Sequence, residues 1–305
     1  MAPTTPRILI VANPNSGGGK ARRLLPLTRD ALAARGYSVQ VFESTGPDQI
    51  RQRVAVLEDR LAALVILGGD GTVREVVQAE PGPDLPLAVL PTGSANVLAT
   101  DLGLPRQPEA LAEMVAAGKT LVVDSARARG LDPEGQEWQT FLLMAGAGLD
   151  ARIVDAVHRK RAGGTLGKLR YVGPTLRIVF GQKYGGQWLV FDDGRREGPF
   201  AQLIVTNVGS YGGIWRLPGG IRIDDGYFDC IGLRARGPLG WFRHAILGTL
   251  NRLRVDKKVF HEAVGHVRVE SEGGEPSPFQ LDGDPGGRTP FEVEVLPGTI
   301  RLVVP

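Results

Sequence analysis

The sequence predicts an α/β protein in which a first domain built on a parallel sheet precedes a second domain rich in antiparallel strands. In the first 125 residues, apolar runs of strand length alternate with helix-sized segments. This alternation is typical of a parallel sheet with right-handed crossovers. Beyond residue 125, short alternating segments separated by Gly, Asp and Pro turns indicate antiparallel strands.

We therefore expect a first domain over residues 1–125 and a second over residues 126–298. The sequence leaves open whether the last strand, residues 299–305, returns to the first domain.

The composition is that of a globular protein with a weak positive charge. The 305 residues carry a net charge of +3, which is too small to argue for nucleic acid but suits an anionic membrane surface or a polyphosphate. A single cysteine excludes a disulfide within the chain and favours a cytoplasmic location. The sequence has neither a signal-peptide pattern at its start nor an apolar run approaching the roughly 20 residues of a transmembrane helix.

The first strand of the predicted parallel sheet covers Arg7–Ala12 and runs into a glycine-rich loop that ends at Lys20. Its glycines allow consecutive backbone N–H groups to face an anion, and Lys20 and Arg22 add positive charge. The loop is not a Walker A motif, because no Ser or Thr follows the lysine. The alternative is a flexible loop before a solvated, basic helix start.

The next elements continue the same alternation. Residues 37–43 alternate in polarity and predict a strand, and residues 47–60 predict a helix. The apolar run Leu64–Leu67 then leads into Gly68, Gly69, Asp70, Gly71 and Thr72, after which helical spacing returns. A strand, a tight turn and a helix N-terminus together favour phosphate binding. Asp70 could position a nucleotide or help hold Mg²⁺, or it could be an ordinary turn aspartate.

A third strand of this kind covers residues 87–90 and ends in the loop Pro91–Asn96, which is rich in small polar residues. Ligands of parallel α/β sheets lie beyond the carboxyl ends of the strands. We therefore expect the three loops to converge on one phosphate-bearing ligand.

The second domain contains strand-like segments interrupted by two helical ones. We expect strands over residues 139–144, 187–191, 202–207 and 230–233, and helices near residues 153–179 and 241–254. Two segments suit docking on anionic lipid. One is a basic stretch formed by residues 158–161 with Lys168 and Arg170, and the other is the start of the second helix, which combines aromatic and basic side chains. The alternative is a packed helix with a solvated basic face.

Taken together, the motifs resemble the diacylglycerol kinase catalytic-domain family, which includes bacterial lipid kinases and sphingosine and ceramide kinases. The likeness covers nearly the whole chain. It rests on Asn13–Gly17, Gly68–Thr72 and Pro91–Asn96 in the first domain, and on Gly146–Ala151, Val205–Asn207, Asp224–Gly226 and Leu281–Asp284 in the second.

The resemblance implies a doubly wound nucleotide-binding domain and a sandwich-like lipid domain, with ATP and Mg²⁺ between them. It implies a lipid acceptor and contact with the inner face of the membrane. The residues expected to bind the nucleotide come from the three loops and from the late acidic motif: Asn13, Ser16, Gly17, Lys20, Arg22, Gly68, Gly69, Asp70, Gly71, Thr72, Thr92, Gly93, Ser94, Asn96 and Asp284.

The resemblance implies that Asp282 and Asp70 are the catalytic residues. Asp282 corresponds to the family's general base, and Asp70 is expected to organise ATP and Mg²⁺. A carboxylate that accepts the hydroxyl proton is what phosphoryl transfer to an alcohol needs. Without the other loops, the Asp282–Gly283 pair would read as a surface hairpin turn.

Three positions depart from the family pattern. Val97 stands where many members have an acid, Ser94 stands where threonine is usual and keeps the hydroxyl, and Asp284 replaces the usual glutamate. Because of Val97, a non-catalytic lipid- or nucleotide-binding protein stays an alternative function. NAD kinases share the glycine-aspartate-glycine motif, so a NAD kinase is a second alternative.

The acidic residues Asp224, Asp225 and Asp229 form a possible structural metal site, because oxygen ligands in a short loop suit Mg²⁺ or Ca²⁺. The alternative is a turn with solvated acids. The sequence also leaves a homodimer, paired through an edge strand, possible.

Overall fold

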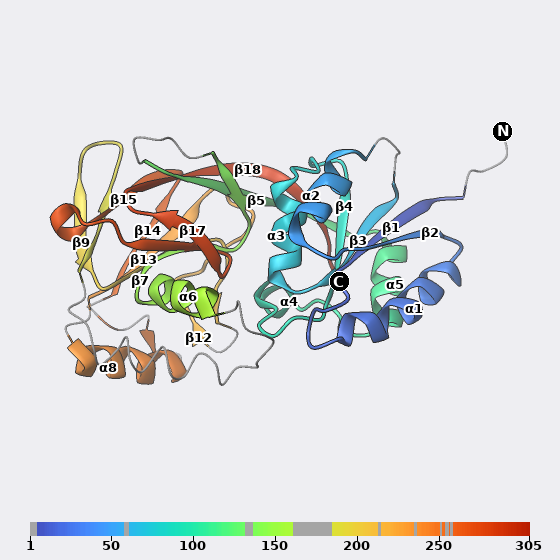
Figure 1. Ribbon diagram of the computed structural model, residues 1–305, viewed down its shortest axis with the longest axis horizontal. Coiled ribbons are helices and arrows are strands. Elements are labelled where there is room, and N and C mark those ends of the chain that lie inside the picture. The colour runs from blue at the N-terminus through green and yellow to red at the C-terminus, as the bar shows by residue number, and fades with distance from the viewer. Residues whose placement is uncertain are drawn as a thin grey trace. The chain divides into compact units, whose positions relative to one another are not determined.

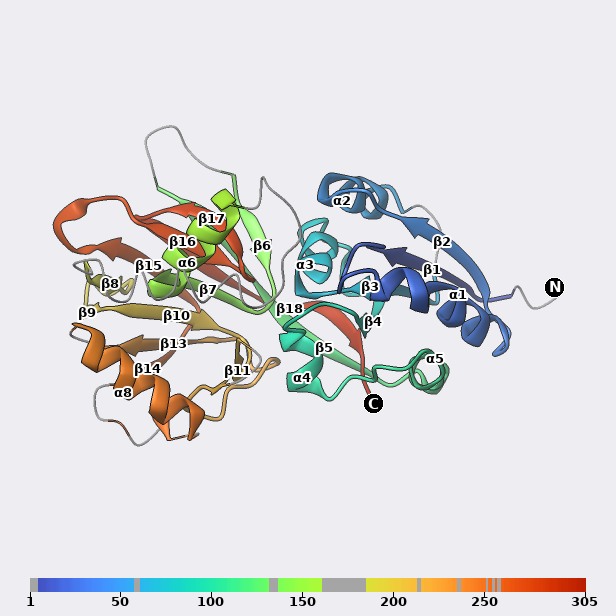
Figure 2. The ribbon, with the colours of Figure 1, turned by 60° about the horizontal axis from the view of Figure 1, so that its bottom comes forward.

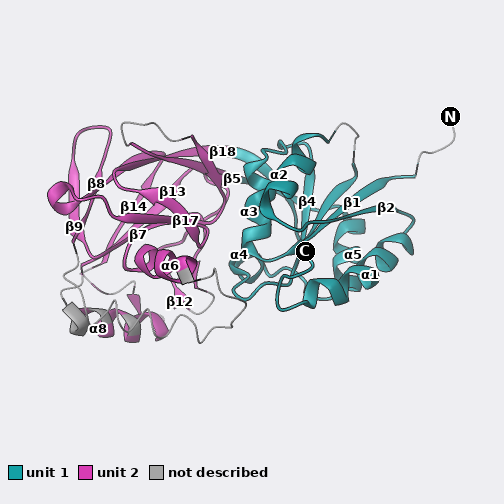
Figure 3. Cartoon of the chain, in the orientation of Figure 1, with its two compact units in different colours: residues 1–123, 298–305 teal, residues 124–297 magenta. Residues whose placement is uncertain are grey.

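The computed structural model describes residues 5–57, 61–131, 137–160, 185–212, 215–234, 237–250, 252–253, 256 and 259–305. The chain divides into two compact units, shown in Figure 3. Unit 1 comprises Met1–Val123 with Gly298–Pro305, and unit 2 comprises Asp124–Pro297. The last residues of the chain therefore belong to unit 1, which answers the question that the sequence left open about the final strand.

Unit 1 alternates strands and helices along the chain. Its elements are β1 (Arg7–Ala12), α1 (Lys20–Ala33), β2 (Ser38–Glu43), α2 (Pro47–Ala55), β3 (Ala63–Gly68), α3 (Asp70–Gln78), β4 (Pro86–Pro91), α4 (Val97–Leu102) and α5 (Pro108–Ala117). The strands are parallel and lie in the order β2-β1-β3-β4, with the end of β18 (Phe291–Val303) beside β4. All of β3 and residues 8–12 of β1 are buried, as expected for a sheet covered on both faces.

The strand order of unit 1 reverses at β1, because β2 lies on one side of it and β3 on the other. The helices α1 and α5 pack together on one face of the sheet, and α2 and α3 pack together on the other (Figures 1 and 2). This is a doubly wound arrangement, and its crevice opens at the carboxyl ends of β1 and β3. The loops after these two strands are those that the sequence singled out.

Among its described residues, unit 2 is built from two large sheets, one two-stranded sheet and two α-helices. Its elements are β5 (Thr120–Gly130, beginning in unit 1), β6 (Gln139–Phe141), β7 (Met144–Gly148), α6 (Leu149–Lys160), β8 (Gln187–Val190), β9 (Arg196–Phe200), β10 (Gln202–Thr206), β11 (Ser210–Tyr211), β12 (Trp215–Arg216), β13 (Phe228–Leu233), α8 (Gly237–Thr249), β14 (Val259–Val264), β15 (His266–Ser271), the short 3₁₀ helix η4 (Glu272–Gly274), β16 (Pro278–Leu281), β17 (Asp284–Arg288) and the first part of β18.

One sheet of unit 2 is antiparallel and has the order β14-β13-β10-β7-β16-β17. The other contains β18, β15, β8 and β9, with β5 beside β18 and β6 beside β5. Side chains of both sheets share one buried core, in which Phe279 stacks on Phe291 at 4.1 Å between ring centroids. The unit is therefore a sandwich, and the predicted fold class is confirmed.

Several boundaries differ from those expected from sequence. The predicted strand over residues 139–144 is two strands, β6 and β7, with a short connection at Leu142–Leu143. The helix expected near residues 153–179 begins earlier, as α6 at Leu149, and the rest of that prediction, including Lys168 and Arg170, lies outside the described residues. Within the described part of the chain, no helix has the length and apolar character needed to cross a membrane.

We expect Cys230 to be unreactive in the native protein. It lies on β13 with 0% exposure, and burial raises the pKa of its thiol above the ordinary value, so that the reactive thiolate is scarce. Labelling by a chromogenic disulfide reagent should be more than about 100-fold slower in buffer than in denaturant, because reaction requires opening of the core. Rapid labelling of the native protein would contradict the burial of β13.

Candidate functional site

The ends of three neighbouring strands in unit 1 are joined by backbone hydrogen bonds. The amide of Asn13, after β1, donates to the carbonyl of Leu67 on β3 at 3.1 Å. The amide of Thr92, after β4, donates to the carbonyl of Gly68 at 2.8 Å. The hydroxyl of Thr92 donates to that of Ser16 at 2.9 Å. The three loops predicted from sequence therefore converge at one edge of the sheet.

Glycines make this convergence possible. A Cβ built on Gly93 would lie 2.6 Å from the Cα of Gly69, and one built on Gly69 would lie 2.9 Å from the Cα of Gly93. Gly17 has a φ of +61°, and a Cβ there would lie 1.8 Å from the carbonyl oxygen of Thr92. Side chains at these positions would push the loops apart, so the glycines set how closely the three backbones approach.

Asp70 begins α3 and supports the start of α4. Its Oδ2 accepts the amide of Val97 at 3.0 Å, and its Oδ1 accepts the amide of Leu98 at 3.4 Å. Burial raises the pKa of this carboxyl above its usual range, and the backbone hydrogen bonds oppose that rise. Asp70 thus links the second loop to the third, the connection that an ordinary turn aspartate would not make. The side chain of Val97, where an acid is usual, is buried.

Asn96 sits at the third loop with a φ of +49° and is 6% exposed. Its Nδ2 donates to the carbonyl of Gly93 at 2.7 Å. Its Oδ1 is buried and accepts no hydrogen bond from the part of the chain that the structure describes. A buried acceptor without a partner is costly unless a ligand or water supplies a donor.

The other nucleotide residues expected in unit 1 surround this point. Gly71 and Thr72 form the first turn of α3, and Lys20 and Arg22 lie in the first turn of α1, which follows Gly19 at a φ of +90°. Thr72 is buried against Gly68, whereas Arg22 and Ser94 are exposed. The positive charge expected near the first loop is thus placed at a helix N-terminus on the edge where the loops meet.

Asp282 lies in unit 2 in the turn between β16 and β17, and Asp284 is the first residue of β17. The Oδ2 of Asp282 accepts the amide of Leu142 at 3.0 Å, and its Oδ1 accepts the amides of Leu143 and Met144 at 2.9 and 2.8 Å. Its own φ is +50°, in the left-handed region. The carboxylate is therefore held in one orientation by three backbone donors from the β6–β7 connection.

Asn207, in a motif noted from sequence, holds the same connection from the other side. Its backbone amide donates to the carbonyl of Leu143 at 2.8 Å, and its Nδ2 donates to the carbonyl of Asp124 at 2.8 Å. Its buried Oδ1 has no hydrogen-bond partner among the described residues. Asp124 in turn accepts the amide of Gly226 at 2.6 Å. Asn207 is thus hydrogen-bonded both to Asp124 and to the β6–β7 connection, which in turn holds the carboxylate of Asp282.

The structure does not bring the three expected metal ligands together. Asp224 pairs with Arg222, Asp225 accepts the amide of Tyr227, and Asp229 lies on β13 against His261 of β14. Among the described residues, no group of three or more His, Cys, Asp or Glu side chains could hold a metal ion. The proximity of the acids in sequence is lost because Asp229 belongs to a strand and the other two to the turn before it.

A half-buried polar cluster in unit 2 was not assigned from sequence. Asp150, on the first turn of α6, accepts the hydroxyl of Tyr211 at 3.1 Å and the Nε2 of Gln280 at 3.2 Å. Burial raises the pKa of both Asp150 and Tyr211. The motif Gly146–Ala151 contained this aspartate, but its partners come from distant strands, so only the fold reveals them.

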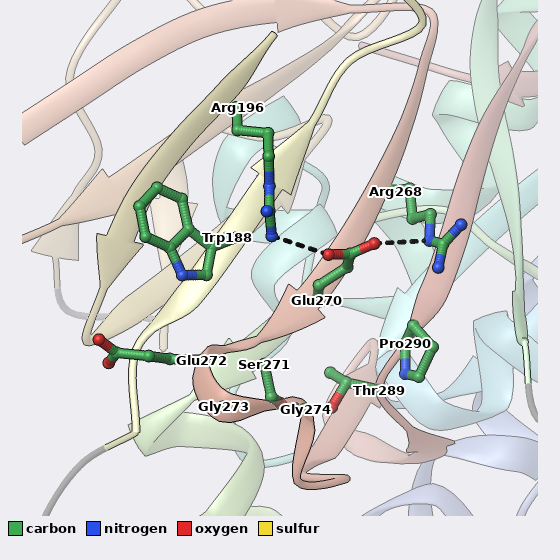
Figure 4. A pocket seen from close by; sticks show the side chains of 10 residues that line it. All are labelled: Trp188, Arg196, Arg268, Glu270, Ser271, Glu272, Gly273, Gly274, Thr289 and Pro290. Atoms are coloured by element: carbon green, nitrogen blue, oxygen red, sulfur yellow. Dashed lines mark hydrogen bonds and ion pairs between the residues drawn. The ribbon is translucent and has the colours of Figure 1, made fainter. Parts of the chain in front are cut away.

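A polar hollow of about 480 Å³ opens elsewhere on unit 2, between β8, β9, β15 and the turn before β18. Arg196 and Arg268 flank Glu270 at this hollow, as Figure 4 shows. It contains none of the site residues predicted from sequence, and both of its arginines pair with Glu270.

Comparison with known proteins accounts for both units. The model of the diacylglycerol kinase catalytic domain matches residues 7–128, and that of the YegS C-terminal NAD kinase beta sandwich-like domain matches residues 144–304. The diacylglycerol kinase of Bacillus subtilis is 26% identical over 98% of this chain and 96% of its own length. A probable YegS-like lipid kinase of Chromohalobacter salexigens is 30% identical over 94% of this chain and 91% of its own.

Solved structures show the same fold. A putative diacylglycerol kinase from Bacillus anthracis aligns with a TM-score of 0.76 at 23% identity, covering 99% of this chain and 97% of that one. A yeast NADH kinase aligns with a TM-score of 0.56 at 13% identity, covering 98% and 83%. The chain belongs to the family of diacylglycerol kinases and YegS-like lipid kinases, as the motifs indicated.

We expect Gly93→Ala to destabilise unit 1. The added methyl group overlaps the backbone of Gly69 and the Oδ1 of Asn96, and overpacking of this kind costs about 1–3 kcal/mol. Gly220→Ala is the matched control, because a Cβ there meets no atom within 4 Å. Urea unfolding followed by circular dichroism measures both. Equal stability of the two variants would contradict the close contact of the second and third loops.

Proposed function

We propose that the protein is an ATP- and Mg²⁺-dependent lipid kinase that transfers the γ-phosphoryl group to a hydroxyl of a diacylglycerol-like or sphingoid-like lipid. The observation that carries this proposal is the convergence of the three strand-end loops of unit 1, joined through Gly69, Gly93 and Thr92. Glycine-lined backbone beside a helix N-terminus is a favourable place for phosphate groups. The names of the relatives support a lipid as acceptor.

The nucleotide is proposed to bind over these loops. The N-terminus of α3, at Asp70 and Gly71, offers backbone N–H groups and the positive end of the helix dipole. The buried Oδ1 of Asn96 can accept a donor from the nucleotide. Asp70 serves this site by fixing α4 against the second loop through Val97 and Leu98, rather than by facing the phosphates with both oxygens.

The residues present fit a Mg²⁺ ion that arrives with ATP and not one held in a protein cage. Mg²⁺ in nucleotide sites usually keeps several waters and binds substrate phosphates with only one or two carboxylates. The described residues contain no group of three metal-binding side chains, so they offer no dedicated cage. When bound, the ion would neutralise charge on the transferring phosphoryl group.

Asp282 is proposed to accept the proton of the lipid hydroxyl. General-base catalysis needs a carboxylate at a fixed position, and the three amides from Leu142 to Met144 provide that fixed position. Asp284 is proposed to lie near the nucleotide, as the family pattern implies. Phosphoryl transfer depends mainly on positioning and charge neutralisation, so a rigid turn is the useful property here.

Contact with the membrane is proposed through α8. Phe242, Ile246 and Leu250 are 65%, 43% and 59% exposed and follow one another at intervals of four residues. Phe242 and Ile246 lie on α8, and this interval places them on one face of the helix. Leu250 directly follows the last residue of α8, and its amide donates to the carbonyl of Ile246 at 2.9 Å, so it continues the same face, with the exposed Arg252 nearby in sequence. An exposed apolar stripe with basic flanks suits the surface of an anionic bilayer. The enzyme would then act in the cytoplasm and visit the inner face of the membrane.

Activity is tested with ATP labelled at the γ-phosphate and a panel of extracted lipids. We expect Mg²⁺-dependent labelling of a lipid, with kcat lowered about 100-fold or more in Asp282→Asn, because the proton acceptor is lost. Asp193→Asn is the control, since Asp193 also accepts a backbone amide in a turn but lies on an exposed hairpin.

Absence of any labelled lipid, or full activity in Asp282→Asn, would overturn the mechanism. Labelling of NAD in the same assay would instead indicate a NAD kinase. Binding of ATP or vesicles without transfer would indicate a non-catalytic binding protein.

Membrane contact is tested by sedimentation with phosphatidylglycerol vesicles. We expect Phe242→Ser and Leu250→Ser each to lower the bound fraction several-fold, because each removes exposed apolar surface from the docking face. Leu27→Ser is the matched control, since Leu27 is 49% exposed but lies on α1 in unit 1. An equal loss of binding in the control would argue against docking through α8.

A further inference from the structure

Gln280 connects the half-buried cluster of Asp150 and Tyr211 to the turn that carries Asp282. It lies on β16 and is 2% exposed. Its Oε1 accepts the amide of Gly283 at 2.7 Å, and its Nε2 donates to the Oδ2 of Asp150 at 3.2 Å. Both bonds form in only one orientation of the side-chain amide, because the reversed amide would present its NH₂ group to the N–H of Gly283. Asp150 therefore determines which way the Gln280 amide faces.

Asp150 is itself held in place by further contacts. Its Oδ1 accepts the amide of Ala151 at 2.6 Å, and its Oδ2 accepts the hydroxyl of Tyr211 at 3.1 Å. Burial raises the pKa of Tyr211, so its hydroxyl remains a donor. Gly146 leaves room for the cluster, because a Cβ there would lie 2.3 Å from the Oδ2 of Asp150 and 2.6 Å from the Nε2 of Gln280.

The turn after β16 needs such support. Asp282 has a φ of +50° and Gly283 a φ of +89°. A non-glycine residue in the left-handed region persists where surrounding contacts over-determine it. Here the amide of Asp282 donates to the carbonyl of Met144 at 2.8 Å, and the amide of Gly283 donates to Gln280. The Gln280 bond thus holds the residue that follows Asp282 in the turn.

We propose that Asp150, Tyr211 and Gln280 are positioning residues that hold the Asp282–Gly283 turn in the conformation required for phosphoryl transfer, a role that rests on the proposed function of Asp282. They act through hydrogen bonds and need no contact with substrate. A misplacement of about 1 Å in a reacting group is enough to cost about 100-fold in rate. Loss of these hydrogen bonds is therefore expected to lower kcat.

An exchange of the two polar partners tests this role. Gln280→Glu places a second carboxylate against Asp150, and we expect kcat to fall about 100-fold, because the turn that carries Asp282 loses its support. Adding Asp150→Asn restores a donor–acceptor pair, with the Asn donating to the Glu, and should return kcat to within about fivefold of the wild type.

Asp155→Asn combined with Gln280→Glu is the matched control, because Asp155 also lies on α6 but pairs with Arg159. It removes the same charge from the same helix without reaching Gln280, and it should not restore kcat. Tyr211→Phe keeps the shape of the ring and loses one hydrogen bond to Asp150, so a smaller fall in kcat is expected. Equal rescue by Asp155→Asn and Asp150→Asn, or a Gln280→Glu enzyme within twofold of the wild type, would overturn the proposal.

Hydrogen exchange separates this proposal from the proposed function. In Gln280→Ala, the amide of Gly283 should exchange at least about tenfold faster than in the wild type, because its acceptor is gone. This measurement needs no activity. Failure of the wild type to phosphorylate any lipid would refute the kinase function, whereas unchanged exchange at Gly283 would refute the support of the turn.

Discussion

The close contact between Gly69 and Gly93 is the constraint on which the proposed nucleotide site depends. Two parallel strands place their ends side by side, but their loops touch only because neither residue has a side chain. The carbonyl of Thr92 lies over Gly17 in the same way, which brings in the first loop. The three loops form one surface because backbone can approach backbone at these positions. The edge of the sheet thereby becomes a place where several N–H groups and a helix N-terminus can meet one anion.

Both aspartates singled out as catalytic serve first as acceptors for backbone amides. Asp70 accepts the amides that begin α4, and Asp282 accepts those of the β6–β7 connection. Each carboxylate therefore joins segments that are far apart in sequence. Such bonds fix the direction of the side chain before any substrate binds, and positioning is the main contribution a protein makes to phosphoryl transfer. The same hydrogen bonds therefore stabilise the fold around each aspartate and orient its carboxylate for the proposed chemical role.

Unit 2 shows how a sandwich can hold a functional turn rigidly. Its two sheets share an apolar core, and the half-buried polar groups of Asp150 and Tyr211 are hydrogen-bonded to one another and to the buried Gln280. A buried polar cluster is stable only where its members satisfy one another, and such clusters specify a single arrangement. Through Gln280 this specificity reaches the turn at Asp282, while α8 presents its apolar stripe elsewhere on the same unit.

The sequence by itself determined the order of strands and helices in unit 1, the three loops at the strand ends and the family. Apolar runs, glycines and small polar residues are local properties, and their consequences for strand ends are local too. What each acid contacts was decided by the tertiary structure. Asp70 meets Val97, 27 residues away, and Asp282 meets Leu142, 140 residues away. The acids at positions 224, 225 and 229 are neighbours in sequence, yet Asp229 turns to His261 on the adjacent strand. Hydrogen-bond partners depend on which strands pair and in which register, and those choices are made by the packing of the whole unit.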